Sequence, residues 1–332
     1  MHKFPAAGLV LLAACGASCG GSSSMMSDMM GGDSAVMPPS VWTMPASGTT
    51  NDLLAIAPGS TGGGLAVGLA DTILSSTNGT TWTLSHSGAF GSGADWAGVW
   101  QSGTSAIIVG DISGKGGVVA GSSDGGKTWS DLHAGTNLPA LVAVWGNGMV
   151  RIVVGAGGTI LVSSDGGKTF AKAASATGAD LDTVWGAGTT VYAGGSGGAL
   201  VSSSNSGGKW QVVASMTNNS VDAIWGVTPV ELYMVVTGGV SRAVNGTMWM
   251  PTAALGGGRY QGAWGGKSNQ LFVVGSDGTW RTGDGGDTWI NELGADSPSG
   301  VTFRGLAVTG SGDGSVIAVG RGGAIARRPS TL

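Results

Sequence analysis

The sequence predicts an all-β fold in which one four-stranded unit is repeated seven times. Three observations predict it: short motifs that end in an aromatic residue recur about every 40 residues, the segments between them are rich in Val, Ile and Gly, and no segment of the repeats keeps helical periodicity. The 332 residues include 66 glycines, as expected for many short strands joined by tight turns.

An inner strand is expected to begin each unit. Seven related pentapeptides mark it: LLAIA (53–57), WAGVW (96–100), LVAVW (141–145), LDTVW (181–185), VDAIW (221–225), YQGAW (260–264) and FRGLA (303–307). Their third residues are all small, namely Ala55, Gly98, Ala143, Thr183, Ala223, Gly262 and Gly305. Small side chains are expected at positions where neighbouring units converge on a common axis.

A second strand follows, in which apolar residues run into glycine. Its copies are LAVG (65–68), IIVG (107–110), IVVG (152–155), VYAG (191–194), the irregular MVVTGG (234–239), FVVG (272–275) and IAVG (317–320). A third strand, a polar turn and a fourth strand complete the unit. Seven units of four short antiparallel strands are the sequence pattern of a seven-bladed β-propeller.

The polar turn recurs as an octamer, SSDGGKTW at 122–129 and SSDGGKTF at 163–170, with related copies at 75–82, 202–210, 241–249 and 281–289. A catalytic site is needed once, whereas a structural device is needed in every unit, so we predict that these turns are structural. The Asp or Asn side chain is expected to accept hydrogen bonds from backbone N–H groups two residues on, the glycines to take positive φ, and the aromatic to pack onto its blade. The structural residues are Ser122, Asp124, Gly126, Thr128, Trp129, Ser163, Asp165, Gly167, Thr169, Phe170, Asp284 and Trp289.

Two copies of the turn depart from the pattern. The register shifts at 202–210, and Asn245 stands where Asp is usual, so both copies are expected to be degenerate. A single carboxylate per turn supplies too few oxygen ligands for calcium. If the ring of Trp129 is buried, replacing it with alanine should cost roughly 3–5 kcal/mol of stability.

The last unit lacks its own closing strand. Six closing aromatics serve seven units, and the chain stops at AIARRPSTL (324–332) before another turn. SVWTMP (40–45) supplies a matching strand, with Trp42 in the place of the missing aromatic. We therefore expect one propeller domain over 40–330, with the ring closed by an N-terminal strand around Trp42.

The N-terminus predicts a lipid anchor. Residues 1–14 hold a basic start and a short apolar run, as in a signal peptide, and Leu12-Ala13-Ala14-Cys15 resembles a bacterial lipobox. Cys15 is then the lipidated residue, and because no Asp follows it, an outer-membrane location is expected; the alternative is an ordinary secretory signal cleaved near Ala17. Residues 15–39 read as a flexible Gly/Ser/Met tether, and Cys19 is left without an internal disulfide partner.

Composition and histidine positions exclude several functions. A net charge of −4 with 10% charged residues gives no basic patch, so no nucleic-acid partner is expected. His86 and His133 follow closing tryptophans in adjacent units. Outer strands lie about 14 Å from the inner strands, so equivalent positions on splayed blades are expected to be more than about 10 Å apart, too far for one metal ion. No metal and no cofactor are expected.

The polar residues that suit a ligand gather in units 6 and 7. They are Arg259, Tyr260, Asp277, Arg304 and Arg321. Three arginines on one face suit a carboxylate, sulfate or phosphate group. The alternative is that each arginine pairs with Asp277, Glu292 or Asp296 on a solvated rim.

The octamers resemble the Asp-box, or bacterial neuraminidase repeat, whose pattern is Ser-x-Asp-x-Gly-x-Thr-Trp. Among families with this repeat, sialidases use six blades and an Arg-Ile-Pro motif that is absent here, and xyloglucanases pair two seven-bladed rings. The single seven-unit domain and the lipoprotein-like start most resemble the photosystem II assembly and stability factor-like family. That resemblance implies a non-enzymatic, monomeric binding or assembly scaffold of the bacterial envelope with a protein partner, attached to the membrane through its lipid alone. The alternatives are a glycan-binding or glycan-cleaving propeller and a purely structural envelope component.

Overall fold

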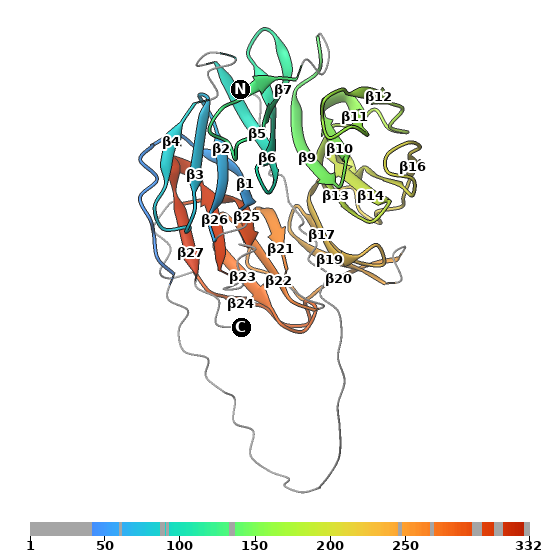
Figure 1. Ribbon diagram of the computed structural model, residues 1–332. Coiled ribbons are helices and arrows are strands. Elements are labelled where there is room, and N and C mark those ends of the chain that lie inside the picture. The colour runs from blue at the N-terminus through green and yellow to red at the C-terminus, as the bar shows by residue number, and fades with distance from the viewer. Residues whose placement is uncertain are drawn as a thin grey trace, which may run out of the picture.

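Seven antiparallel sheets, the blades, follow one another along the chain and stand around a common axis (Figure 1). This computed structural model describes residues 42–59, 62–86, 90, 93–132, 137–244, 248–265, 269–293, 301–308 and 315–328. The first inner strand contacts the last one, so the blades form a ring. The predicted seven-bladed β-propeller is confirmed.

The inner strands contain the seven pentapeptides. They are β1 (Leu53–Pro58), β5 (Ala94–Ser102), β9 (Leu141–Asn147), β13 (Leu181–Ala187), β17 (Val221–Thr228), β21 (Tyr260–Trp264) and β25 (Phe303–Val308). Their small third residues meet the neighbouring blade, as predicted: a Cβ on Gly98 would lie 2.6 Å from the Val142 carbonyl oxygen. The hydroxyl of Thr183 accepts a hydrogen bond from the Ile224 backbone N–H at 3.3 Å.

Each inner strand pairs with a second strand, and the second with a third. The second strands are β2 (Gly64–Gly68), β6 (Ser105–Ile112), β10 (Val150–Gly155), β14 (Thr190–Gly195), β18 (Glu231–Val236), β22 (Leu271–Gly275) and β26 (Val316–Gly320). The third strands are β3 (Thr72–Ser76), β7 (Gly116–Ser122), β11 (Thr159–Ser163), β15 (Leu200–Ser203), β19 (Gly239–Val244), β23 (Gly278–Thr282) and β27 (Ile325–Arg328). Short 3₁₀ turns join second to third strands in blades 3, 4 and 7, at η1 (Ala156–Gly158), η2 (Ser196–Gly198) and η3 (Arg321–Gly323).

A β-bulge interrupts the start of all seven inner strands. In blade 4, Leu181 pairs with Gly195 and Thr183 with Gly194, so the second residue of the pentapeptide is skipped, and the other blades repeat this register. The skipped residues are Leu54, Ala97, Val142, Asp182, Asp222, Gln261 and Arg304. A bulge re-aims the side chain that it leaves unpaired. We call this end of the ring the bulge face and the opposite end, where the polar turns lie, the turn face.

In six of the seven blades a glycine at or near the end of the second strand lies against the backbone where this bulge begins. A Cβ on Gly195 would collide with the carbonyl oxygen of Asp180, the residue before β13. In the irregular blade 5, Val236 takes the corresponding place opposite Val221.

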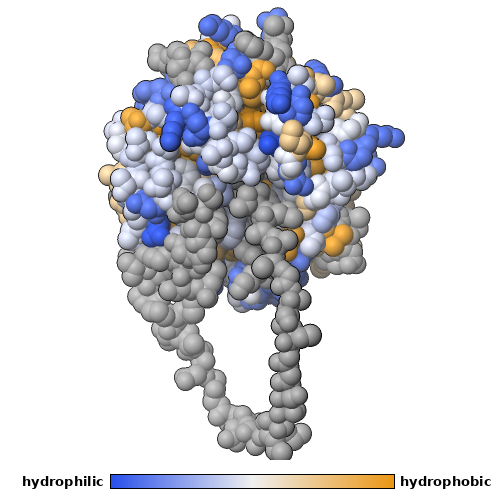
Figure 2. All heavy atoms as spheres, in the orientation of Figure 1, coloured by the Kyte–Doolittle hydropathy of each residue, from blue (hydrophilic) through white to orange (hydrophobic). Residues whose placement is uncertain are grey.

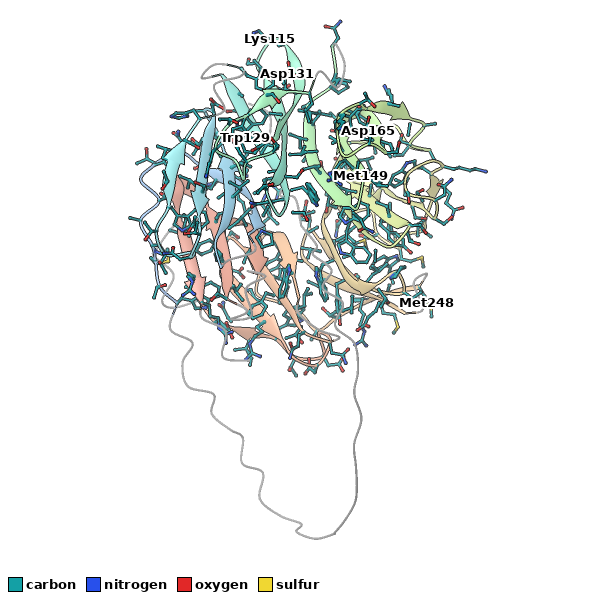
Figure 3. The ribbon with its side chains drawn as sticks, in the orientation of Figure 1. Lys115, Trp129, Asp131, Met149, Asp165 and Met248 are labelled. Carbon is teal, nitrogen blue, oxygen red and sulfur yellow. The ribbon has the colours of Figure 1, made fainter. Side chains whose placement is uncertain are left out.

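The outer strands of blades 1 to 6 are only two to four residues long. They are β4 (Thr83–Ser85), β8 (Ser130–Asp131), β12 (Ala171–Ala173), β16 (Gln211–Val212), β20 (Met248–Pro251) and β24 (Ile290–Asn291). Short strands limit the exposed hydrogen-bonding edge of each blade. The turn face and the outer strands also carry exposed apolar side chains, among them Met149 and Met248 (Figure 3).

Blade 7 has three strands in the described part of the chain. An isolated antiparallel bridge joins Thr43 to Arg327 through two backbone hydrogen bonds of 2.8 Å. Trp42 packs against a buried cluster that includes Phe272 and Ala326. Closure by a full N-terminal strand stays a prediction, because residues 40 and 41 lie outside the described residues.

Large apolar side chains fill the spaces between blades. Trp96, Trp145 and Trp185 are at most 2% exposed. Most of the described surface visible in Figure 2 is pale, as expected from its Gly, Ser and Thr residues. Within the described residues, no helix is long and apolar enough to span a membrane. The signal peptide, the tether, Cys15, His133, Asn245 and Asp296 lie outside them.

Candidate functional site

The polar turns on the turn face satisfy their own polar groups. In blade 2, Asp124 Oδ1 accepts hydrogen bonds from the N–H groups of Lys127 and Thr128 at 2.9 and 3.0 Å, and the Thr128 hydroxyl donates to Oδ2 at 2.6 Å. The Ser122 hydroxyl donates to Oδ1 and accepts the Gly126 N–H, both at 2.8 Å. Hydrogen bonds from Thr128, above all, hold the pKa of Asp124 well below its usual range. Both carboxylate oxygens are thus occupied within the turn.

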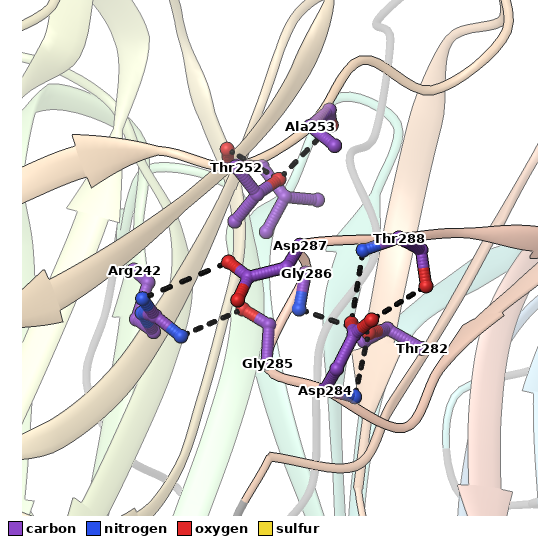
Figure 4. Close-up of polar contacts among 10 residues, drawn as sticks. Arg242, Thr252, Ala253, Thr282, Asp284, Gly285, Gly286, Asp287 and Thr288 are labelled. Atoms are coloured by element: carbon purple, nitrogen blue, oxygen red, sulfur yellow. Dashed lines mark hydrogen bonds and ion pairs between the residues drawn. The ribbon is translucent and has the colours of Figure 1, made fainter. Parts of the chain in front are cut away.

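The other copies repeat this arrangement. Asp165 binds Thr169, and Asp284 binds Thr288, in the same way (Figure 4 for blade 6). The same threonine hydrogen bonds lower the pKa values of both carboxyl groups. The bonded N–H groups lie two and three residues after Asn78 in blade 1, the first as predicted, but three and four residues after the Asp of blade 2. The copy at 202–210 keeps the geometry through Asn205, which accepts from the Lys209 N–H at 2.9 Å, so the prediction that it is degenerate is wrong in geometry.

Each turn also contacts the preceding blade. A Cβ on Gly126 would meet Leu65 of blade 1, and one on Gly167 would meet Ile107 of blade 2. In blade 6, Arg242 of blade 5 donates to the Gly285 carbonyl at 3.3 Å and lies 3.9 Å from Asp287 (Figure 4). The turns therefore hold neighbouring blades together.

On the bulge face, aspartates join one blade to the next. Asp95, Asp180 and Asp52 each precede an inner-strand pentapeptide and accept a backbone N–H from the preceding blade, at 2.9, 2.7 and 2.9 Å. In blade 6 the corresponding residue is Arg259, which is exposed. Blade 6 thus brings a positive charge to a position where three other blades use a carboxylate.

The three predicted arginines act on one another at this face. Arg304 is the bulge residue of blade 7, its side chain is 15% exposed, and its Nη2 lies 4.0 Å from Asp52 Oδ2. Burial lowers the pKa of Arg304, and the positive charges of Arg321 and then Arg259 lower it further, while Asp52 opposes them. Arg321, like Arg259, is exposed. The site therefore has one largely buried and two exposed arginine side chains.

Tyr260 and Asp277 face each other. The Tyr260 hydroxyl lies 2.6 Å from the Gly256 carbonyl oxygen and 3.0 Å from Asp277 Oδ2, and Trp280 Nε1 donates to Asp277 Oδ1 at 3.3 Å. The Tyr260 side chain is fully buried, and burial raises the pKa of its hydroxyl. Tyr260 and Asp277 thus connect the start of β21 to the turn that follows β22. Their part in ligand binding stays a prediction.

The alternative pairing of the arginines with Glu292 is not what the structure shows. Glu292 lies between Arg281 and Arg328, with Nε to oxygen distances of 2.6 and 3.0 Å. His86 Nδ1 lies 2.8 Å from the Asp71 carbonyl oxygen. In the part of the chain that the structure describes, no three His, Cys, Asp or Glu residues are placed to hold a metal ion.

Two carboxylates that the sequence motifs did not identify as site residues also lie at the bulge face. Asp182 and Asp222 are the bulge residues of blades 4 and 5 and are 8% and 1% exposed. Burial raises the pKa of Asp182 to about 7, with the charges of Asp222 and Asp180 adding and Arg259 opposing. Burial likewise raises the pKa of Asp222 to about 6, although the charge of Arg259 and the hydrogen bond from Thr237 lower it. The second residue of each pentapeptide, apolar in units 1 to 3 and polar in units 4 to 7, is the signal that finds them.

The comparisons with known proteins agree on the fold. No family model and no curated protein matches the chain. The structure is similar to YCF48 bound to a D1 peptide, with a TM-score of 0.73 and 18% identity over 89% of this chain and 98% of that one. The WD40 β-propeller domain of Doa1 is similar with a TM-score of 0.68 and 12% identity, over 88% of this chain and 98% of that one. The GH74 xyloglucanase from Xanthomonas campestris is similar with a TM-score of 0.63 and 16% identity, over 88% of this chain and 54% of that one. At these identities the likenesses establish the propeller and nothing beyond it.

Proposed function

We propose that this protein is a non-enzymatic binding scaffold that holds an anionic group of a protein partner at its bulge face, between Arg259, Arg304 and Arg321. The observation that carries the proposal is that the bulge face brings three arginines together: Arg304 is the bulge residue of β25, Arg321 donates its backbone N–H to Thr302 just before β25, and Arg259 precedes the adjacent strand β21. Like charges repel, so such a cluster is stabilised when an anion joins it. Guanidinium groups match the geometry of carboxylates.

Other features are consistent with a scaffold. The polar turns use their carboxylates internally, whereas the bulge face brings three arginines of blades 6 and 7 together. YCF48, a propeller of similar fold, has been solved with a bound peptide. A lipid on Cys15 and the 15–39 tether would hold the ring near an envelope membrane, within about 25–30 Å root-mean-square reach of the anchor.

A second candidate, glycan binding or cleavage, is favoured by Asp182 and Asp222. Glycoside hydrolysis uses two carboxyl groups, one of which is protonated near neutral pH, and the raised pKa values of this pair suit that division. Release of reducing sugar from envelope polysaccharide by the wild type, and its loss in Asp182→Asn, would establish this function instead.

The scaffold proposal is tested by replacing Arg259, Arg304 and Arg321 together with alanine. The tagged protein is cross-linked in its own cells, and the amount of each co-purified protein is quantified. We expect a partner that is captured by the wild type and reduced at least tenfold in the triple variant, because each lost charged hydrogen bond contributes about 1.5–3 kcal/mol.

The matched control removes the same charge from the turn face: Lys127, Lys168 and Lys209, all changed to alanine. This control should capture as much partner as the wild type. Equal capture by the arginine variant, when circular dichroism and melting show that it is folded, would overturn the proposal. Enrichment of polysaccharide with no protein would favour the glycan function.

A further inference from the structure

The carboxylates Asp182 and Asp222, in blades 4 and 5, are buried but accept few hydrogen bonds within the described part of the chain. Asp182 accepts no hydrogen bond from the described residues, and Asp222 has one weak contact, from the Thr237 hydroxyl at 3.4 Å. Both side chains are more than nine-tenths buried. Buried carboxylates are normally paired or hydrogen-bonded, because an uncompensated buried charge is costly.

The pair belongs to the same level of the ring as the arginine site. All seven bulge residues lie where the inner strands begin, and going round the ring they change from apolar (Leu54, Ala97, Val142) to acidic (Asp182, Asp222), amide (Gln261) and basic (Arg304). Arg259 precedes β21, which packs between β17 and β25, so it lies between the two charged sectors, and it acts electrostatically on both carboxylates and on Arg304. An acidic and a basic site thus adjoin at the bulge face.

We propose that the bulge face binds a polypeptide segment that carries both a positive and a negative charge. An arginine or lysine side chain of the segment contacts Asp182 and Asp222. A carboxylate of the segment contacts Arg259, Arg304 and Arg321. The inference rests on the proposed function, to which it adds the cationic subsite and the chemical class of the partner segment. A guanidinium group donates up to five hydrogen bonds in a fixed plane, which suits two neighbouring carboxylates.

A metal ion fits this pair less well. Calcium takes six to eight oxygen ligands, and no three His, Cys, Asp or Glu residues among the described ones are placed to hold a metal ion. The positive charge of Arg259 beside the pair further disfavours a divalent cation. An organic cation, with one charge and several donors, satisfies the same carboxylates at lower electrostatic cost.

The cationic subsite should depend on pH. Asp182 and Asp222 bind a cation when they are ionised, so affinity should rise as pH increases from 5 to 8 through their raised pKa values. Asp180 and Arg259 are the other charged groups that act on the pair. The strands packed against β13 and β17 also carry Arg151 and Glu231, but these two residues lie at the opposite, turn-face end of the ring. A carboxylate-binding site formed by arginines alone would show little change over this range.

The test uses labelled peptides in which one arginine and one aspartate are separated by one to four glycines. Matched peptides carry citrulline in place of arginine, or asparagine in place of aspartate. Binding to the full chain is measured at pH 8 and pH 5. For the best spacing we expect citrulline, and separately the double variant Asp182→Asn/Asp222→Asn, to weaken binding roughly 10- to 100-fold, with little further loss when both changes are combined.

Asp287→Asn, on the turn face, is the matched control and should bind as the wild type does. Peptides that bind through their aspartate to Arg259, Arg304 and Arg321, with no effect of citrulline or of the Asp182→Asn/Asp222→Asn variant, would overturn this inference and leave the proposed function standing. Failure of every peptide would count against both. Calcium binding that the double variant abolishes would assign the pair to a metal and overturn the inference as well.

Discussion

Trp210→Ala is expected to lower the free energy of unfolding by about 3–5 kcal/mol. The indole of Trp210 closes the polar turn of blade 4, is 5% exposed, and belongs to the largest buried apolar cluster, which extends through blades 1 to 4. Its Nε1 donates to the Gly207 carbonyl at 2.9 Å. The change would therefore leave a cavity between blades and an unsatisfied carbonyl in the turn.

Urea denaturation followed by circular dichroism measures this effect. Trp129→Ala is the matched control, because Trp129 holds the same position in blade 2 with the same Nε1 bond, to Gly126 at 3.1 Å, but its ring is only partly buried. The control should lose distinctly less stability than Trp210→Ala, and less than the 3–5 kcal/mol expected of a buried ring. An equal loss in both variants would show that burial does not set the contribution of the closing aromatic.

Gly195→Ala is expected to destabilise the protein by about 3 kcal/mol or more, because its Cβ would collide with a backbone atom and not with a movable side chain. The atom is the carbonyl oxygen of Asp180, whose carboxylate also accepts the Gly157 N–H at 2.7 Å. To relieve the collision, the start of β13 has to shift, and with it the bulge that positions Asp182. The variant should therefore lose both stability and the blade 3 to blade 4 contact.

Thermal melting and soluble yield test this change. Gly178→Ala, two residues before Asp180, is the control, since a Cβ there meets no atom within 4 Å. It should melt at the temperature of the wild type. A Gly195→Ala protein that melts with its control would mean that the second-strand glycines are not required by the bulge.

The fold was predictable because its signals are periodic. The pentapeptides, the second-strand glycines and the polar turns each recur in nearly every unit, so an error in one copy is corrected by the others. The geometry of the turn was less predictable: Asn205 supports it in blade 4, because one side-chain oxygen suffices to accept the Lys209 backbone N–H. The shifted sequence register of the turn at 202–210 therefore did not imply a change in its structure.

The candidate site was predictable only in part, because it depends on residues that break the repeat. Arg304 and Arg259 stand out as charges in the sequence, and the structure brings their guanidinium groups within electrostatic reach of each other. Asp182 and Asp222 were harder to identify, because a polar residue within an apolar motif is also typical of a strand with alternating buried and exposed side chains. Their environment follows from the bulge, which depends on the strand register and is not encoded by the pentapeptide alone.

The central claim is that partners bind at the bulge face. A photo-cross-linking amino acid at Asn219, exposed on the bulge face beside blade 5, is compared with one at Lys127, exposed on the turn face. Both proteins are expressed in the native cells, irradiated, and analysed for cross-linked polypeptides. We expect a protein adduct from position 219 that is lost when Arg259, Arg304 and Arg321 are replaced, and none from position 127. An adduct from position 127 alone would contradict the claim.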